Sequence, residues 1–204
     1  MSRRSAARSG TGGGDPGEMV FRIVAGLAAG ALGVWALDRV DWFMWNREDP
    51  RARARTTAVR PNGEPPAQAL VSKAEDAAGK RLESAAHEAA SQVVHYAIGM
   101  GPAIGYALLR DRLPAGGVAR GALYGAALFV MQDEALNTAT SLGAQPRDYP
   151  RQAHARGIVA HIVYGIATEL TLNLIEKFTT GRTRLIQGGR SQTGVRPARR
   201  PLST

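Results

Sequence analysis

Hydrophobic residues gather in four stretches of the chain, and charged or turn-forming segments separate them. Residues 19–37 are apolar apart from Arg22, and further apolar runs cover 93–110, 121–142 and 157–176. About 20 helical residues, each rising 1.5 Å, cross a hydrocarbon core about 30 Å thick. The pattern predicts an all-α fold, a polytopic membrane bundle with about four transmembrane helices at these positions.

The first apolar stretch has a second interpretation, because a basic start followed by an apolar run is also typical of a signal peptide. The run continues to Leu37, however, and passes directly into the segment DRVDWFMWNRED. Trp42, Phe43 and Trp45 in that segment resemble an aromatic belt at a membrane interface. We therefore interpret 19–37 as a retained anchor.

The third stretch also has two interpretations, because Asp133 and Glu134 interrupt it after only eleven apolar residues. Eleven residues are too few to cross a bilayer, so a short helix of the soluble type is one possibility. The other is a full span over 121–142 with two carboxylates near mid-depth. We favour the full span, because Arg120 and the segment GAQPRDYPRQ form suitable interfacial ends.

The polar segments complete the predicted domain organisation. Residues 1–17 and 179–204 are Gly- and Arg-rich tails that we expect to be disordered, around a membrane domain at 18–178. Inside that domain, 46–92 is a charged loop followed by an Ala-rich helix from residue 67. These segments lower the mean hydropathy of the whole chain to −0.19 and hide the apolar stretches.

The charged residues predict that the protein also contacts lipid headgroups. The 204 residues include 26 Lys and Arg against 17 Asp and Glu, a net charge of +9, and no cysteine. A soluble, basic helical protein that binds nucleic acid is the alternative, but no recognition motif is present. Basic residues that flank apolar helices indicate anionic lipid headgroups instead. We predict a membrane protein that binds no nucleic acid and has both termini in the cytoplasm.

Small residues at four-residue spacing predict close helix packing inside the bundle, since helices in lipid associate where their backbones can approach. The glycines in this pattern are Gly26, Gly30, Gly33, Gly101, Gly105, Gly121 and Gly125. They pack helices either within one chain or between chains, so a homo-oligomer or a partner membrane protein is possible. Pro102 is expected to free a carbonyl near Gly99–Gly101.

Ionisable residues within the apolar stretches are the candidate functional groups, because each costs about 2.5–3.5 kcal/mol at membrane depth and needs an inward-facing partner. In the four-span arrangement Glu169 lies about 18 Å deep and Glu134 about 12 Å deep from the same side. Asp133 or Glu134 is therefore expected to approach Glu169. His95 and His161 form a shallower layer.

These groups support two hypotheses. Carboxylates in a medium of low dielectric and histidines near neutrality make a proton-responsive site, linked through Tyr96, Tyr106, Tyr164 or water. Alternatively, the same side chains only hydrogen-bond the helices together. His154 lies seven residues before His161 on the same helix face and is expected beyond the hydrocarbon. Metal binding is a third and less favoured possibility, since no ligand motif is present.

No phosphate loop, nucleophile elbow or paired-carboxylate motif is found, so neither an enzyme nor a cofactor site is predicted. The segments HYAIGMGPAIGYALLRDRLP, RGALYGAALFVMQDEALN and QAHARGIVAHIVYGIATE resemble the YagU-like group of bacterial inner-membrane proteins. DRVDWFMWNREDPRARARTTAVRP is similar to members of that group as well. The resemblance covers roughly residues 20–178 and implies a polytopic inner-membrane protein associated with acid tolerance, without assigned ligand residues.

The predicted function is thus a non-enzymatic role in proton homeostasis or acid tolerance, through Asp133, Glu134, Glu169, His95 and His161. The alternative is a structural or assembly protein whose small-residue faces bind other membrane proteins.

Overall fold

The computed structural model describes residues 16–113 and 115–191, with side chains as far as Thr179. This part of the chain is helical and contains no strand, which confirms the predicted all-α class. The α-helices are α1 (Pro16–Trp45), α2 (Pro50–Val59), α3 (Pro66–Ala78), α4 (Ser84–Leu109), α5 (Gly117–Leu128), α6 (Asn137–Ala139) and α7 (Arg151–Ser191). Short helical turns are η1 (Pro61–Gly63), η2 (Arg110–Arg112), η3 (Phe129–Leu136) and η4 (Pro146–Asp148).

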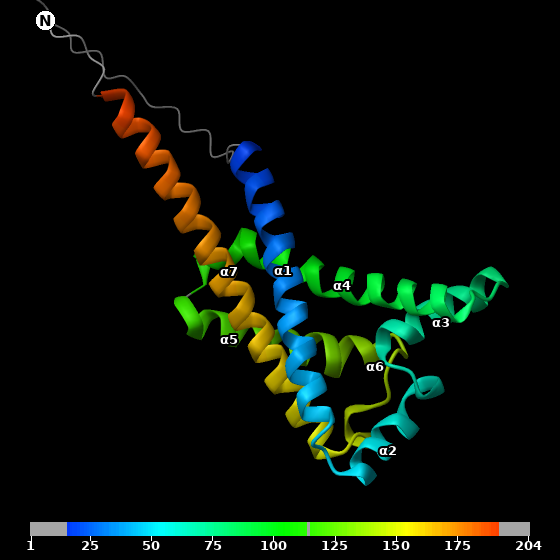
Figure 1. Cartoon of the computed structure of the whole chain (residues 1–204). Helices are drawn as coiled ribbons and strands as arrows, with labels where there is room; N and C mark the ends of the chain where they lie inside the picture. Colours follow the sequence, from blue (N-terminus) through cyan, green and yellow to red (C-terminus); the bar gives the residue numbers. More distant parts are fainter. Residues whose placement is uncertain (1–15, 114, 192–204) are drawn as a thin grey trace, which may run out of the picture.

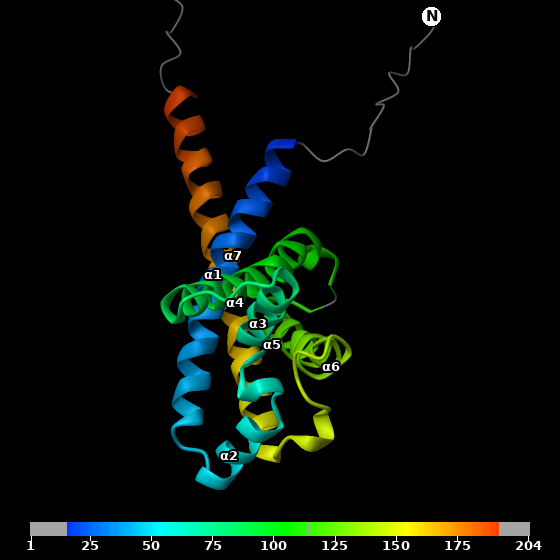
Figure 2. The ribbon, with the colours of Figure 1, turned by 90° about the vertical axis from the view of Figure 1, so that its right-hand side faces the viewer.

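Helices α1 and α7 pack against each other and run in opposite directions (Figures 1 and 2). The start of α1 and the end of α7 therefore lie at the same end of the molecule. Helix α4 and the segment from α5 to α6 cross this pair steeply. The arrangement differs from the predicted bundle, in which four helices run side by side through the bilayer.

Two helices in the described ranges are long and apolar enough to cross a membrane, Pro16–Trp45 and Arg151–Thr179. Only 33% of the residues in the apolar part of the first helix, and 39% in the second, are buried. Their exposed large apolar side chains include Met19, Val24, Leu32, Trp35, Leu170, Leu174 and Phe178. The prediction of four spans is not confirmed, because α4 and α5 do not reach the same length and apolarity.

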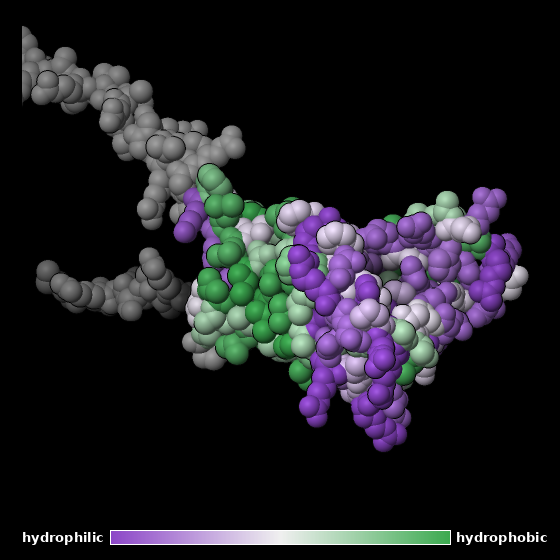
Figure 3. Space-filling model, turned by 60° about the horizontal axis from the view of Figure 1, so that its bottom comes forward, coloured by the Kyte–Doolittle hydropathy of each residue, from purple (hydrophilic) through white to green (hydrophobic). Residues whose placement is uncertain are grey.

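The exposed hydrophobic surface is concentrated in one part of the face that Figure 3 shows, where the described chain begins and ends. Mainly hydrophilic side chains cover the other part of this face. Single apolar side chains such as Leu70 and Leu82 are exposed elsewhere in the chain. The hydrophilic side includes α2, with Arg51 and Arg55 exposed. This division is expected of a helical protein that is partly inserted in a membrane. Lipid stabilises exposed apolar side chains, whereas water and lipid headgroups stabilise arginines.

Glycines bring the four long helical segments into contact. A Cβ atom on Gly26 or Gly30 of α1 would lie within 3 Å of the α4 backbone. A Cβ atom on Gly121 or Gly125 of α5 would meet carbonyl oxygens of α7, at 2.6 and 2.0 Å. Gly33 lies equally close to Tyr164 and Thr168 of α7. Close packing at these five predicted positions is thus present within one chain.

Two of the predicted packing glycines make no such contact. A Cβ atom on Gly101 or Gly105 would find no other heavy atom of the described residues within 4 Å, so these two glycines do not bring helices of the described chain together. Gly99 faces Val34 instead, and the carbonyl of Gly99, next to the one that Pro102 frees, accepts a hydrogen bond from the Tyr164 hydroxyl at 2.6 Å. Gly165, outside the predicted set, contacts the Gly121 carbonyl.

The boundaries differ from the predicted ones in three places. The Ala-rich helix expected from residue 67 is two helices, because Gly79 takes a left-handed conformation (φ 63°) that ends α3. The second of them, α4, continues through the second predicted span. Helix α7 continues to Ser191, within the predicted tail 179–204. Residues 1–15 and 192–204 of the predicted tails lie outside the described residues.

The junction of α3 and α4 is held by Glu75, whose side chain is 8% exposed. Its carboxylate accepts hydrogen bonds from the Leu82 backbone at 3.1 Å and from Arg81 at 3.2 Å, and lies 3.1 Å from His87 Nδ1. The hydrogen bond with His87 is the main cause that holds the pKa of Glu75 below its usual value of 4.5. A carboxyl with a lowered pKa stabilises the folded state above its unfolded pKa.

We therefore expect the α3–α4 junction to loosen at acid pH. The contribution of Glu75 is complete above about pH 4.5 and is lost as the pH falls through its lowered folded-state pKa. Amide hydrogen exchange at Leu82 measures the loss between pH 6 and pH 3. Glu75→Gln removes this acid dependence, whereas Glu88→Gln, at an exposed position on α4, leaves it in place. An unchanged acid dependence in Glu75→Gln contradicts this account.

Candidate functional site

A cavity of about 270 Å³ lies beside the second half of α1, between α4, η3, α7 and the segment around residues 60–67. Its apolar wall includes Leu37, Ile98, Leu128 and Phe129. Its ionisable lining consists of Asp38, Asp41, Arg60, His95, Asp133, Glu134, Tyr149, His154, Arg156, His161 and Tyr164. Four of the five predicted proton-responsive residues therefore share one cavity, and the fifth, Glu169, does not line it.

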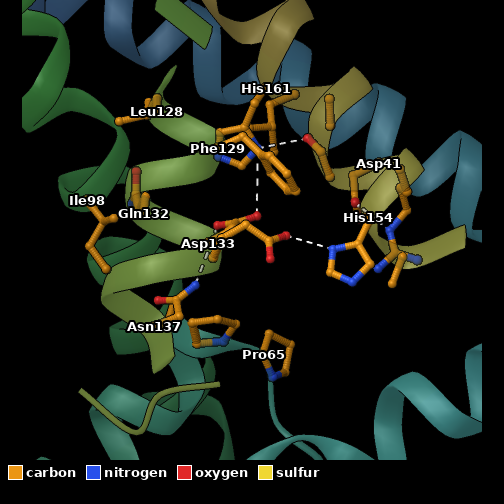
Figure 4. A pocket seen from close by; sticks show the side chains of 18 of the residues that line it. Asp41, Pro65, Ile98, Leu128, Phe129, Gln132, Asp133, Asn137, His154 and His161 are labelled. Carbon is orange, nitrogen blue, oxygen red and sulfur yellow. Dashed lines mark hydrogen bonds and ion pairs between the residues drawn. The ribbon is translucent and has the colours of Figure 1, made fainter. Parts of the chain in front are cut away.

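The carboxylates Asp133 and Glu134 enter the cavity from η3, a π-helical turn that continues α5. The predicted third span, 121–142, is thus helical to Ala139 but has a π segment in its middle. A π-helix has more residues per turn than an α-helix, so it changes which side chains face inward, and such segments often occur at functional sites. Figure 4 shows Asp133 projecting from η3 into the cavity, toward the side chains of α7.

Each cavity histidine faces a carboxylate from another element. His95 of α4 lies 2.8 Å from Asp38 of α1, and His154 of α7 lies 2.7 Å from Glu134 of η3. His161 of α7 lies 3.8 Å from Asp133. Because each pair connects two different elements, a change in the charge of a histidine acts directly on the contacts between the elements around the cavity.

Asp133 has the longest hydrogen-bond and ion-pair distances of these carboxylates. Its hydrogen bond from Asn137 is long, at 3.5 Å, and His161 Nδ1 is already 2.9 Å from the Gly157 carbonyl. The Asp133 side chain remains 37% exposed and projects into the cavity (Figure 4). It is the acidic group of the lining with most capacity to accept a proton or a donor from a ligand.

Two arginines, Arg60 and Arg156, line the wall of the cavity near Trp45. Arg156 donates to Asp41 at 2.7 Å and to Glu48 at 2.5 Å, and its guanidinium lies over the Trp45 ring at 4.7 Å. The guanidinium of Arg60 also lies near that ring, at 6.0 Å. Burial lowers the pKa of Arg60, and the charge of Arg156 nearby lowers it further. This wall therefore connects α7 to the end of α1 and to the segment after α2.

Glu169 belongs to a second cluster, and the prediction that Asp133 or Glu134 approaches it is wrong. Its fully buried carboxylate accepts from Arg120 at 2.6 Å, Tyr106 at 2.8 Å and Arg110 at 2.9 Å. Asp133 lies instead against His161, eight residues earlier on α7, or about 12 Å by the helical rise. Glu169 is therefore the centre of a buried ion-pair network rather than a member of a carboxylate layer.

Sequence reasoning missed the two arginines that satisfy Glu169. Arg110 and Arg120 were expected at or near the ends of spans, yet their side chains are only 3% and 14% exposed. The signal was present, because a lone Glu in an apolar helix requires a cation, and these are the nearest arginines at the adjoining span ends. Arg110 also donates to Asn173 at 3.1 Å and to Glu176 at 2.5 Å.

Tyrosines lie between the two clusters. Tyr164 lines the cavity, and its hydroxyl is 3.2 Å from that of Tyr124. The Tyr124 ring stacks on Tyr106 at 4.0 Å, and Tyr106 donates to Glu169. Tyr106 and Tyr164 thus lie where a link was expected, although the step between Tyr106 and Tyr124 is ring stacking. The sequence had placed His154 beyond the hydrocarbon and had not indicated the other ionisable lining residues, which are Asp38, Asp41, Arg60, Tyr149 and Arg156.

In the part of the chain with described side chains, no three His, Asp or Glu groups converge closely enough to hold a metal ion.

Comparisons with known proteins find no relative of this chain. No family model, curated protein or solved structure matches the chain. The resemblance to the YagU-like group therefore stays a prediction from the sequence, and the site has to be interpreted from its own chemistry.

Proposed function

We propose that this chain is a multi-pass protein of the bacterial inner membrane that responds to protons through the cavity beside α1 and α7. The observation that carries the proposal is that three histidine–carboxylate pairs line one cavity and join α1, α4, η3 and α7. Histidine is the side chain whose ordinary pKa, near 6.5, lies in the physiological range. Acid tolerance or proton homeostasis is the role that such a site supports.

The membrane arrangement follows from the two apolar helices. With α1 and α7 crossing in opposite directions, both termini lie on one side, which we assign to the cytoplasm. The cavity is lined by α1 from Val34 to Asp41, close to Trp42 and Phe43, and therefore lies toward the outer side. The exposed arginines of α2 lie at the same end, where anionic headgroups are suitable partners.

Proton binding changes the sign of the charge around the cavity. With neutral histidines, the four lining carboxylates outweigh the two arginines, and the lining carries a net charge of −2. Protonation of all three lining histidines gives +1. The groups that face one another are Asp38 and Asp41 from α1, His95 from α4, Asp133 and Glu134 from η3, His154, Arg156 and His161 from α7, and Arg60 and Tyr149 from the connecting segments. A pH change is therefore expected to alter how these elements pack.

Histidine titration by NMR in detergent micelles tests this proposal. The chain has four histidines, and His87 lies outside the cavity, paired with Glu75. We expect the ring signal of His95 to shift its titration midpoint toward lower pH in Asp38→Asn, because the hydrogen bond with Asp38 is the main cause that raises the pKa of His95 above its ordinary value. The His87 signal serves as the internal control, because its partner Glu75 is unchanged in this variant. Midpoints that are the same in the wild type and the variant contradict a coupled site.

A structural or assembly role is the second candidate, and one observation favours it. Most of the small-residue faces are covered within the chain, but no described residue packs on the Gly101–Gly105 face of α4. An open glycine face permits close approach of another helix. In this case the ionisable groups only connect the helices, and loss of the carboxylates changes stability without changing the histidine titrations.

A further inference from the structure

The cavity has the size and lining of a small-molecule site as well as of a proton site. Its volume of about 270 Å³ is far larger than a single ordered water needs. Pockets of this kind combine apolar walls with a few polar groups that orient the ligand. Here Leu37, Ile98, Leu128 and Phe129 supply the apolar wall, and Asp133 projects into the cavity (Figure 4).

The distribution of charge selects the sign of the ligand. Arg156 is occupied by Asp41 and Glu48, and Arg60 lies with it around Trp45, so the positive charge of the lining is gathered on one wall. Asp133 has no hydrogen bond shorter than 3.5 Å among the described contacts. An anion in the cavity would meet four lining carboxylates, whereas a cation would give Asp133 a short, charge-assisted hydrogen bond.

We propose that the cavity binds a compact organic cation, a protonated amine with an apolar or aromatic body, and that Asp133 is its counter-charge. The ammonium group would donate to Asp133, and the apolar body would lie against Leu128 and Phe129, where an aromatic ring also favours a nearby cation. The inference rests on the proposed role of the cavity as the functional site, but it does not require that the histidines titrate as a coupled set.

Calorimetric titration of the purified protein in detergent micelles at pH 7.5 tests the inference, with benzylammonium as the probe. Benzyl alcohol and benzoate have nearly the same shape and carry neutral and negative groups. We expect saturable binding of benzylammonium, and at least tenfold weaker binding of the other two, because only the cation pairs with Asp133. Equal binding of benzyl alcohol, or no saturation with benzylammonium, overturns the inference.

Variants locate the site. Asp133→Asn is expected to weaken benzylammonium binding at least tenfold, and Asp133→Glu to keep most of it. Asp76→Asn, on α3 and 60% exposed, is the matched control and should bind as the wild type does. Unchanged binding in Asp133→Asn also overturns the proposal. The wild-type comparison of cation with alcohol holds even if a variant fails to fold. Coupled histidine titrations without amine binding would contradict only this inference, and amine binding without coupled titrations only the proposed function.

Discussion

Glu169→Gln is expected to destabilise the protein by about 3–5 kcal/mol, since removal of one partner from a buried ion pair leaves the other charge uncompensated. The Glu169 side chain is fully buried, and both Arg110 and Arg120 donate to it. A glutamine keeps the shape and one acceptor oxygen but removes the charge. The midpoint of thermal unfolding in detergent measures the loss.

Glu176→Gln is the matched control for this prediction. Glu176 also accepts a hydrogen bond from Arg110, but its side chain is 44% exposed, so its removal should cost about 1 kcal/mol or less. The double variant Glu169→Gln, Arg120→Gln should recover part of the loss, because it also removes one buried charge. Equal shifts for Glu169→Gln and Glu176→Gln would show that burial does not govern this network.

The same variant separates the two clusters functionally. If Glu169 only balances the arginines, Glu169→Gln changes stability and leaves the titration of His95, the cavity histidine paired with Asp38, as in the wild type. The sequence had grouped Glu169 with Asp133 and Glu134. A changed histidine titration in a folded Glu169→Gln protein would support that grouping against the one in the structure.

Gly125→Ala is the second substitution expected to have a large effect. A Cβ atom at this position would lie 2.0 Å from the His161 carbonyl oxygen, and backbone atoms cannot move aside as a flexible side chain can. Helices α5 and α7 must separate, at a cost of about 3 kcal/mol or more, at the upper end of overpacking changes. Because His161 lies at this contact, the pair between His161 and Asp133 is also displaced.

Gly105→Ala provides the control. It lies in the same kind of small-residue pattern, but its Cβ atom would meet nothing within 4 Å. Alanine has the higher helix propensity, so the variant should be neutral or more stable by up to about 1 kcal/mol. The thermal unfolding midpoints of the two variants, measured under the same conditions, test the close contact between α5 and α7. A Gly125→Ala protein as stable as Gly105→Ala would contradict the α5–α7 contact.

The apolar stretches led to correct predictions where the signal was local. The helices over 19–37 and 157–176 are present as parts of α1 and α7, and both are apolar enough to cross a membrane. The other two stretches are helical as well, but α4 begins earlier, in the Ala-rich segment, and the third contains a π segment. Apolar periodicity indicates that a segment is a helix, and it contains little information on the direction in which that helix crosses its neighbours.

The candidate site shows the same limit. The five ionisable residues chosen from the sequence all have partners, and four of them line one cavity. Their partners Asp38, Arg110 and Arg120 were not predicted, because each lies far along the chain from the residue with which it pairs. The separations are 57 residues for His95–Asp38, 59 for Arg110–Glu169 and 49 for Arg120–Glu169.

The sequence by itself determined the helical class and the positions of two helices able to cross a membrane, since the spacing and length of apolar runs are local properties. Only the tertiary structure decided which glycines pack and which carboxylate meets which cation. Gly101 and Gly125 occur in similar sequence patterns, yet one is open and the other touches a backbone. The rotation and crossing of each helix make that difference, and they depend on the whole set of contacts at once.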